Sequence, residues 1–269
     1  MKKTLVALFA LAGTFVSDGA TTLRYLIEFN TGNGGVTNSV ESTSAGATSI
    51  TQTGYVNWNN ETTMDGSSYV HPLTSSNWKI DDTNGIDNGN GEALNASDGF
   101  TIMFNGYATS QNWGDFVSFT VGTQSYKLEI NNSDGLNVYN ATQQNSYDAQ
   151  LTNIDRLTWY NYGVSVYDGT CTLVAIDSAG TVIDETSFSG LSGNLTNITD
   201  IASFEMHSGK GYFTDNIAVY DGAIDTDTMV AITKAQVAGK GTLAVVPEPA
   251  TASLSLLGLA ALMIRRRRA

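Results

Sequence analysis

The chain is poor in cysteine, proline, histidine and charged side chains. Its 269 residues include one cysteine, three prolines and two histidines, and charged residues make up 14% of the total. One cysteine excludes an intramolecular disulfide, and the count of Cys and His is too low for a structural zinc cluster. Scarce charge argues against long surface helices, which are rich in Glu, Lys and Arg. These absences favour a protein built from strands and turns.

The single cysteine, Cys171, lies in the alternating segment 170–177. In such a segment a cysteine is usually a small buried strand residue. A reactive thiol would need a basic neighbour, and the surrounding sequence has none. We therefore expect Cys171 to belong to the core.

Acidic residues dominate between the two ends of the chain. Lys2, Lys3 and the run Arg265–Arg268 are terminal, so residues 21–246 keep 7 of the 13 basic residues and 24 of the 26 acidic ones. The net charge of this body is near −17, compared with −13 for the whole chain. Such a surface repels phosphate backbones, which excludes nucleic acid as an expected partner, and it attracts divalent cations.

Strand patterns recur along the body every 8 to 12 residues. Large apolar residues alternate with polar ones in segments 22–29, 100–104 and 126–130, and Asp134-Gly135 and Asp168-Gly169 are hairpin signals. Residues 31–53 favour a long loop or weak edge strands, and Thr226 to Gln236 is the best helix candidate. The rhythm predicts an all-β, antiparallel β-sandwich.

The first 20 residues have the pattern of a secretory signal peptide. Lys2 and Lys3 precede the apolar run 5–16, and the small residues Ser17, Gly19 and Ala20 follow it. The run is too short to span a bilayer comfortably, so cleavage after Gly19 or Ala20 is expected. The alternative is a buried N-terminal helix.

The last 23 residues form a second targeting pattern. Pro247-Glu248-Pro249 is followed by an apolar segment, 250–264, and then by Arg265, Arg266, Arg267 and Arg268. As a helix those 15 residues would span about 22 Å, short of the roughly 30 Å hydrocarbon core of a membrane. They predict a short transmembrane helix whose arginines stay in the cytoplasm, with the body outside the inner membrane.

These three parts together resemble the PEP-CTERM sorting signal of Gram-negative bacteria. The resemblance implies recognition by an exosortase-type transpeptidase, which cuts near Pro247-Glu248-Pro249 and passes the body to the cell surface or the extracellular matrix. The alternative is a simple C-terminal anchor, which has the same topology but keeps its tail. The resemblance covers residues 247–269 only.

The body resembles a second family, the LamG-like, concanavalin A-like jelly rolls. Its landmarks are the segments 98–104, 159–169, 173–180 and 211–221, which match in order and spacing over about residues 21–235. The resemblance implies two packed antiparallel sheets and a role in binding carbohydrate or protein, sometimes through calcium. Some relatives are glycoside hydrolases.

Catalytic carboxylates of the kind those hydrolases use are not found. The pattern Glu-x-Asp-x-x-Glu is absent, and Asp184-Glu185 and the segment 221–227 lack its alternation. His71 and His207 have the sequence surroundings of loop or surface residues, so no triad is expected. We therefore predict a non-enzyme and keep a glycan-active enzyme with an unfamiliar site as the alternative.

Two candidate binding sites remain. The acidic loop 81–92 could bind calcium weakly, because it is rich in oxygen ligands, although Ile86 breaks the EF-hand order. The other candidates are tryptophans that could form platforms for sugars: Trp113 first, then Trp58 and Trp78. Solvated loop residues and core tryptophans are the respective alternatives. The calcium ligands would come from Asp81, Asp82, Asn84, Asp87, Asn88, Asn90 and Glu92.

The sequence therefore predicts four segments: a signal peptide (1–20), a LamG-like sandwich (21–235), a linker (236–246) and a sorting tail (247–269). We expect an exported surface or matrix protein that acts as a binding or structural module, with carbohydrate as the expected ligand.

Overall fold

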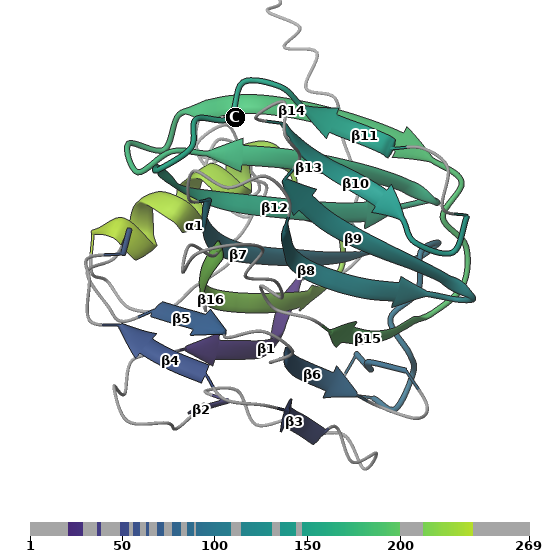
Figure 1. The fold of residues 1–269 in the computed structure, drawn as a ribbon. Helices are drawn as coiled ribbons and strands as arrows, with labels where there is room; N and C mark the ends of the chain where they lie inside the picture. The colour runs from purple at the N-terminus through teal and green to yellow at the C-terminus, as the bar shows by residue number, and fades with distance from the viewer. Residues whose placement is uncertain are drawn as a thin grey trace, which may run out of the picture.

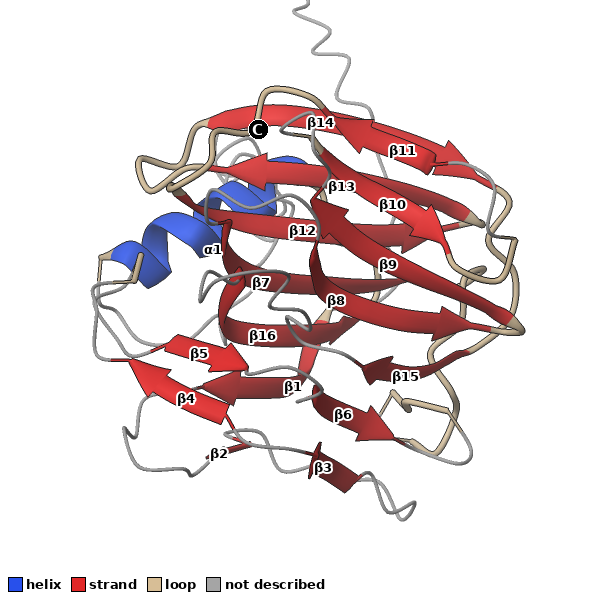
Figure 2. Ribbon diagram, viewed as in Figure 1, coloured by secondary structure: helices blue, strands red, loops and turns tan. Residues whose placement is uncertain are grey.

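The computed structural model describes residues 21–28, 37–38, 49–53, 56–59, 63–64, 69–72, 77–81, 85–88, 90–108, 114–130, 135–143, 147–199 and 212–238. Within these residues two antiparallel β-sheets pack face to face, with a single helix beside them (Figure 1). Figure 2 shows how far strands dominate the described chain. The predicted all-β antiparallel sandwich is confirmed.

The larger sheet, sheet A, has nine strands. Seven of them follow one another across the sheet, while β5 pairs with β16 and β4 pairs with β5. In order, the strands are β14 (Val182–Ser189), β13 (Thr170–Ile176), β12 (Trp159–Tyr167), β7 (Phe100–Ala108), β16 (Tyr212–Asp221), β1 (Thr22–Glu28) and β2 (Thr37–Asn38), with β5 (Tyr69–Pro72) and β4 (Val56–Asn59) to one side.

The smaller sheet, sheet B, has seven strands and lies in front of sheet A in the view of Figure 1. It contains two consecutive hairpin pairs, β8 with β9 and β9 with β10. In order, its strands are β11 (Tyr147–Leu151), β10 (Leu136–Asn140), β9 (Gln124–Ile130), β8 (Gly114–Val121), β15 (Leu195–Thr199), β6 (Asn77–Asp81) and β3 (Ser49–Thr53).

The core lies between the two sheets, and alternation decides which residues enter it. Phe100, Ile102 and Phe104 point inward from sheet A, and Leu128 and Ile130 from sheet B. All five are completely buried. Their polar neighbours in each strand lie on the outer faces, as a side-chain period of two requires. Cys171 is also in this core, and burial raises the pKa of its thiol, so the predicted core placement is confirmed.

The helix α1 (Thr226–Val237) covers the outer face of sheet A. It begins where the Asp225 side chain accepts a hydrogen bond from Thr228 N at 2.7 Å, a normal N-cap. Met229 and Ile232 then pack in a second apolar cluster with residues of β1, β7, β13 and β16. The predicted helix over 226–236 is confirmed, and it leaves sheet B without a helix among the described residues.

One glycine makes this packing possible. Gly163 lies in β12 beneath α1, where an added Cβ would meet the Met229 side chain and would lie 2.9 Å from Val174 Cγ1. Only the absence of a side chain lets the helix approach this closely.

The first strand differs from its predicted alternation. Leu23 and Tyr25 were expected on one face, but a β-bulge between them places Tyr25 in the inter-sheet core and Leu23 under α1. A bulge adds one residue and so reverses the faces that follow it. The prediction for these two side chains was wrong because register depends on the partner strand, β16.

Other predictions need correction as well. Asp81, expected in the acidic loop, ends β6, and His71, expected in a loop, lies in β5. The strands β6, β11 and β15 were not anticipated, whereas β2 and β3 are the expected weak edge strands. The sequence also predicts a strand over 201–206, a segment that lies outside the described residues.

No helix among the described residues is both long and apolar enough to cross a bilayer. Both targeting segments, 1–20 and 247–269, lie outside those residues.

Gly163→Ala should destabilise the sandwich by about 1–3 kcal/mol, because the new methyl group overpacks the contact between β12 and α1. Urea-induced unfolding followed by circular dichroism measures this. Tyr167→Ala is the control on the same strand, since Tyr167 is exposed, and it should change stability by less than about 0.5 kcal/mol. Equal stability of Gly163→Ala and the native chain would contradict the described docking of α1.

Candidate functional site

Two carboxyl groups lie side by side on the outer face of sheet B. Asp115 of β8 and Glu129 of β9 are direct cross-strand partners. Their side chains point away from the core, because Leu128 and Ile130, on either side of Glu129, point into it. Lys127, two residues before Glu129 on the same face, places Nζ 2.6 Å from Asp115 Oδ2. A charge-assisted hydrogen bond therefore holds one member of the carboxyl pair.

Tyrosines from the next two strands border this pair. Tyr139 of β10 lies opposite Lys127, and Tyr147 of β11 lies opposite Tyr139. The two rings meet edge to face, with centroids 6.2 Å apart. Tyr147 is 38% exposed and hydrogen-bonds to Glu129. The carboxyl pair thus has aromatic surface beside it that solvent reaches.

Two buried polar atoms on the same face make no hydrogen bond within the described structure. They are Asn137 Oδ1, on the residue paired with Glu129, and Ser118 Oγ, on the residue paired with Lys127. Asn137 is fully buried, and its Nδ2 makes only a long 3.5 Å contact with Gly135 O. An unsatisfied buried polar atom costs about 1–3 kcal/mol, so both atoms gain from a hydrogen-bonding partner.

We refer to this group of residues as the outer-face cluster. It consists of Asp115, Ser118, Lys127, Glu129, Asn137, Tyr139 and Tyr147.

The electrostatics of the cluster favour a protonated Glu129. Burial, followed by the negative charge of Asp115, raises the pKa of Glu129 from 4.5 to about 7, although Lys127 and the hydrogen bond from Tyr147 act in the opposite direction. Burial disfavours the charged form of a carboxyl group, and a second carboxylate beside it adds to that effect. The site therefore gains a negative charge as the pH rises through about 7.

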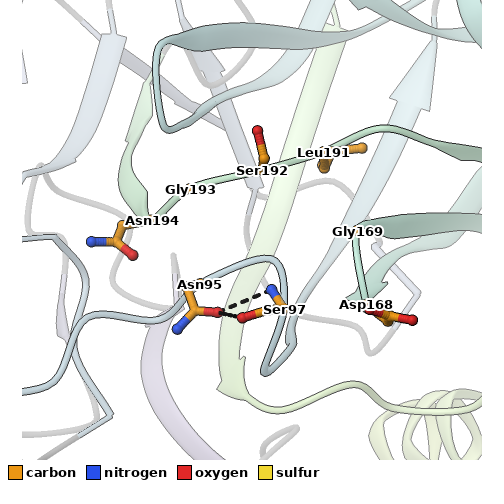
Figure 3. A pocket seen from close by; sticks show the side chains of 8 residues that line it. All are labelled: Asn95, Ser97, Asp168, Gly169, Leu191, Ser192, Gly193 and Asn194. Carbon is orange, nitrogen blue, oxygen red and sulfur yellow. Dashed lines mark hydrogen bonds between the residues drawn. The ribbon is translucent and has the colours of Figure 1, made fainter.

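A second candidate is a pocket of about 480 Å³ where three turns meet (Figure 3). Asp168 and Gly169 form the β12–β13 turn with φ angles of 47° and 69°, and Gly169 N donates to Ala96 O at 2.8 Å. Asp168 and Asn194 lie on opposite sides of the pocket in Figure 3. It is lined by Asn95, Ser97, Asp168, Gly169, Leu191, Ser192, Gly193 and Asn194.

The polar groups of this pocket largely serve its own turns. Asn95 Oδ1 accepts hydrogen bonds from Ser97 N at 2.9 Å, Ser97 Oγ at 2.6 Å and Asp98 N at 2.9 Å. Side chains used in this way shape a turn and have few acceptors left for a ligand. The outer-face cluster is therefore the stronger candidate.

The predicted sugar platforms are divided between described and undescribed parts of the chain. Trp58 lies in β4 of sheet A and Trp78 in β6 of sheet B, so the fold does not bring these two together on one sheet. Trp113 lies outside the described residues, immediately before Gly114, where β8 begins. All three remain predictions.

The predicted calcium loop is partly described. Asp87 is buried and forms a bridge with Ala93, while Glu92 accepts a hydrogen bond from Asn88 Nδ2 at 3.1 Å and the Asn88 side chain caps Asn90 N at 2.9 Å. Asp81 ends β6, and Asp82 and Asn84 lie outside the described residues. Among the residues that the structure describes, no three Asp, Glu, His or Cys side chains group around a possible metal position. Calcium binding stays a prediction.

The sorting residues also lie outside the described structure. They are Pro247, Glu248 and Pro249 and the basic run Arg265, Arg266, Arg267 and Arg268.

The outer-face cluster was not anticipated from the sequence. The alternation of Lys127 and Glu129 with core residues did mark them as outward-facing. The sequence does not reveal the register in which β8 pairs with β9, and this register places Asp115 opposite Glu129. The available signal was an acidic residue just before the apolar segment that begins at Phe116, together with another near the end of the alternating segment 126–130.

Glu129→Gln should change how stability depends on pH. Between pH 4.5 and about 7 the folded protein keeps a proton that the unfolded chain releases, so native stability should fall as pH rises through this window. The stability of the variant should not fall in this window. At pH 8 its melting temperature should therefore exceed that of the native chain, by about 2–4 °C for each 1 kcal/mol of difference in stability.

Thermal melts at pH 4, 6 and 8 test this prediction. Glu185→Gln, on the exposed edge of β14, is the control and should follow the native profile. Parallel pH profiles for the native chain and Glu129→Gln would contradict the raised pKa of Glu129.

No protein-family model matches the chain, and no curated protein matches it in sequence. Solved structures do match it in fold. The binding domain of botulinum neurotoxin serotype D aligns with a TM-score of 0.59 at 9% identity, over 80% of this chain and 51% of that one. The serotype G binding domain gives 0.57 at 12% identity, over 80% and 51%. The binding domain of Paraclostridial Mosquitocidal Protein 1 gives 0.52 at 14% identity, over 81% and 52%.

The chain therefore spans about half the length of the solved structures it matches. Identities this low show a shared fold and leave function to be argued from the site. What the chain shares with these domains is its architecture, an antiparallel β-sandwich.

Proposed function

We propose that this protein is an exported binding module with a concanavalin A-like jelly-roll fold, and that it binds carbohydrate at the cell surface or in the extracellular matrix. The main support is the outer-face cluster. It lies on a sheet face that no described helix covers, and it combines exposed tyrosine with carboxyl, amide and hydroxyl groups. Sugars present hydroxyls and apolar ring faces, which these groups match.

Export is supported by the two ends of the sequence. The charged and apolar start predicts a signal peptide, and Pro247-Glu248-Pro249 with its apolar and arginine segments predicts the sorting tail. An exosortase-type transpeptidase and, transiently, the inner membrane are the partners this implies. The neighbours in fold are binding domains of toxins, which is compatible with a binding role here.

A glycan-active enzyme is the second candidate. The raised pKa of Glu129 favours it, because a protonated carboxyl can serve as a general acid. Against it, Asp115 and Glu129 hydrogen-bond to each other, whereas glycosidases hold their two carboxyl groups about 5 Å or more apart to flank the bond they cleave. A reducing-sugar assay on a polysaccharide panel separates the two. Released ends that are lost in Glu129→Gln would support the enzyme.

Binding can be measured on a glycan array with the full chain in a polyoxyethylene detergent, which has no sugar headgroup, with and without calcium. Tyr147→Ala should weaken binding at least about tenfold, or about 1.4 kcal/mol, because it removes the exposed ring beside Glu129. Trp113→Ala tests the platform predicted from the sequence.

Tyr167→Ala is the matched control for Tyr147→Ala, because Tyr167 is similarly exposed, at 43%, and lies on the other sheet. Its binding should equal that of the native chain. A well-folded protein that binds nothing on the array would remove the carbohydrate proposal and leave a structural role at the surface.

Processing of the tail can be followed by mass spectrometry in a Gram-negative host that makes an exosortase-type transpeptidase. The mature chain should end near Pro247, and replacing Pro247, Glu248 and Pro249 together by alanine should leave the tail attached. A native chain that keeps its tail in the host would instead support the simple anchor.

A further inference from the structure

The outer-face cluster has two hydrogen-bonding positions that the described structure does not fill. Ser118 Oγ and Asn137 Oδ1 lie on either side of β9, next to Lys127 and Glu129 respectively. Directly paired residues in neighbouring strands hold their Cβ atoms about 4.5–5.5 Å apart. The two unfilled positions are two strands apart and offset by two residues, so they lie at the ends of one patch about 12 Å long that runs from β8 to β10.

A hydroxyl group suits this patch because it can donate and accept at once. Asn137 Oδ1 can only accept, and Ser118 Oγ can do either. The neighbouring Lys127 ammonium only donates. Hydroxyls on neighbouring units of one glycan could thus satisfy both buried atoms and still interact with the groups between them.

The patch gives an anionic ligand little positive charge to bind. Among the described residues, the positive charge beside the carboxyl pair is Lys127, and its Nζ lies 2.6 Å from Asp115 Oδ2. The other described side chains that face Glu129 are an amide and two phenols: Asn137 and Tyr139 from β10 and Tyr147 from β11. Asp148 lies at the irregularity in the pairing of β10 with β11, and its charge raises the pKa values of Tyr126 and Cys171 instead.

The local charge is therefore close to zero when Glu129 is protonated and −1 when it is ionised. The whole chain adds a net charge of −13. A ligand carboxylate would meet repulsion at short range and from the overall field.

We propose that the outer-face cluster binds neutral glycans through their hydroxyl groups and rejects glycans that carry uronate carboxylates. This proposal rests on the function proposed above and specifies its ligand class. The tyrosine rings receive the apolar face of a sugar, Asn137 and Ser118 bond its hydroxyls, and the carboxyl pair excludes anions.

The discrimination should grow with pH. The pKa of Glu129 is about 7, so ionisation adds a negative charge between pH 6 and pH 8. A neutral glycan is little affected by that charge, whereas a uronate is repelled more strongly.

The test compares sugars that differ at C6: galactan with polygalacturonate, and mannan with polymannuronate. Binding of each to the full chain is measured by biolayer interferometry at pH 6 and pH 8, in the sugar-free detergent. At pH 8 we expect the neutral polymer of at least one pair to bind at least about tenfold more tightly than its uronate. The ratio should be smaller at pH 6.

Two variants assign the effect to the cluster. Glu129→Gln should keep neutral binding and give the same ratio at both pH values. Asn137→Leu, which removes the acceptor at similar volume, should weaken neutral binding about tenfold while thermal melts confirm a folded protein. Asn161→Leu is the matched control, since Asn161 is also fully buried with an unsatisfied Oδ1 but lies in β12 of sheet A.

The outcomes separate the two proposals. Uronates that bind as tightly as the neutral polymers at pH 8 would overturn the ligand class while leaving carbohydrate binding intact. Neutral binding that is unchanged in Asn137→Leu, or equally reduced in Asn161→Leu, would place the site elsewhere and also overturn the inference. No binding to any polymer would overturn both proposals.

Discussion

The two sheets are joined by an aromatic contact on which the remaining geometry depends. Phe104 and Tyr162 of sheet A and Phe116 of sheet B are fully buried, and their ring centroids lie 5.4 to 5.9 Å apart. Each of the three comes from a central strand, and such ring pairs contribute about 0.5–1.5 kcal/mol beyond their buried area. Because this contact fixes which face of β8 points inward, it also fixes that Asp115, one residue before Phe116, points outward.

The outer faces of the two sheets differ in whether a described helix covers them. That of sheet A is covered by α1, since Met103, Val174 and Ala218 form an apolar surface for the helix. The corresponding face of sheet B has Lys127 and Glu129 at such positions, and these cannot be buried against an apolar helix without a large desolvation cost. The same alternation of residues thus builds a core on one side of sheet B and, on the other, a polar face that no described helix covers.

The sequence predicted most of what depends on local pattern. Phe100, Ile102 and Phe104 were placed in the core, and the Asp168-Gly169 turn and the helix after Asp225 were placed correctly, because alternation, turn chemistry and capping are local. The side chain of Tyr25 and the pairing of Asp115 with Glu129 were not predicted. Both depend on register between strands, and for Tyr25 on a bulge, and one residue of shift changes the face of every side chain that follows.

Stability alone does not explain the composition of the outer-face cluster. A threonine pair in place of Asp115 and Glu129 would suit the same strands and avoid both like-charge repulsion and partial burial of a carboxyl. The chain instead keeps a carboxyl whose pKa burial raises, and beside it two buried polar atoms without hydrogen-bond partners in the described structure. Such costs are typical of places where residues serve binding rather than folding. The carboxyl pair and these two atoms lie together on the sheet face that no described helix covers, and that juxtaposition is the physical reason to place the proposed function there.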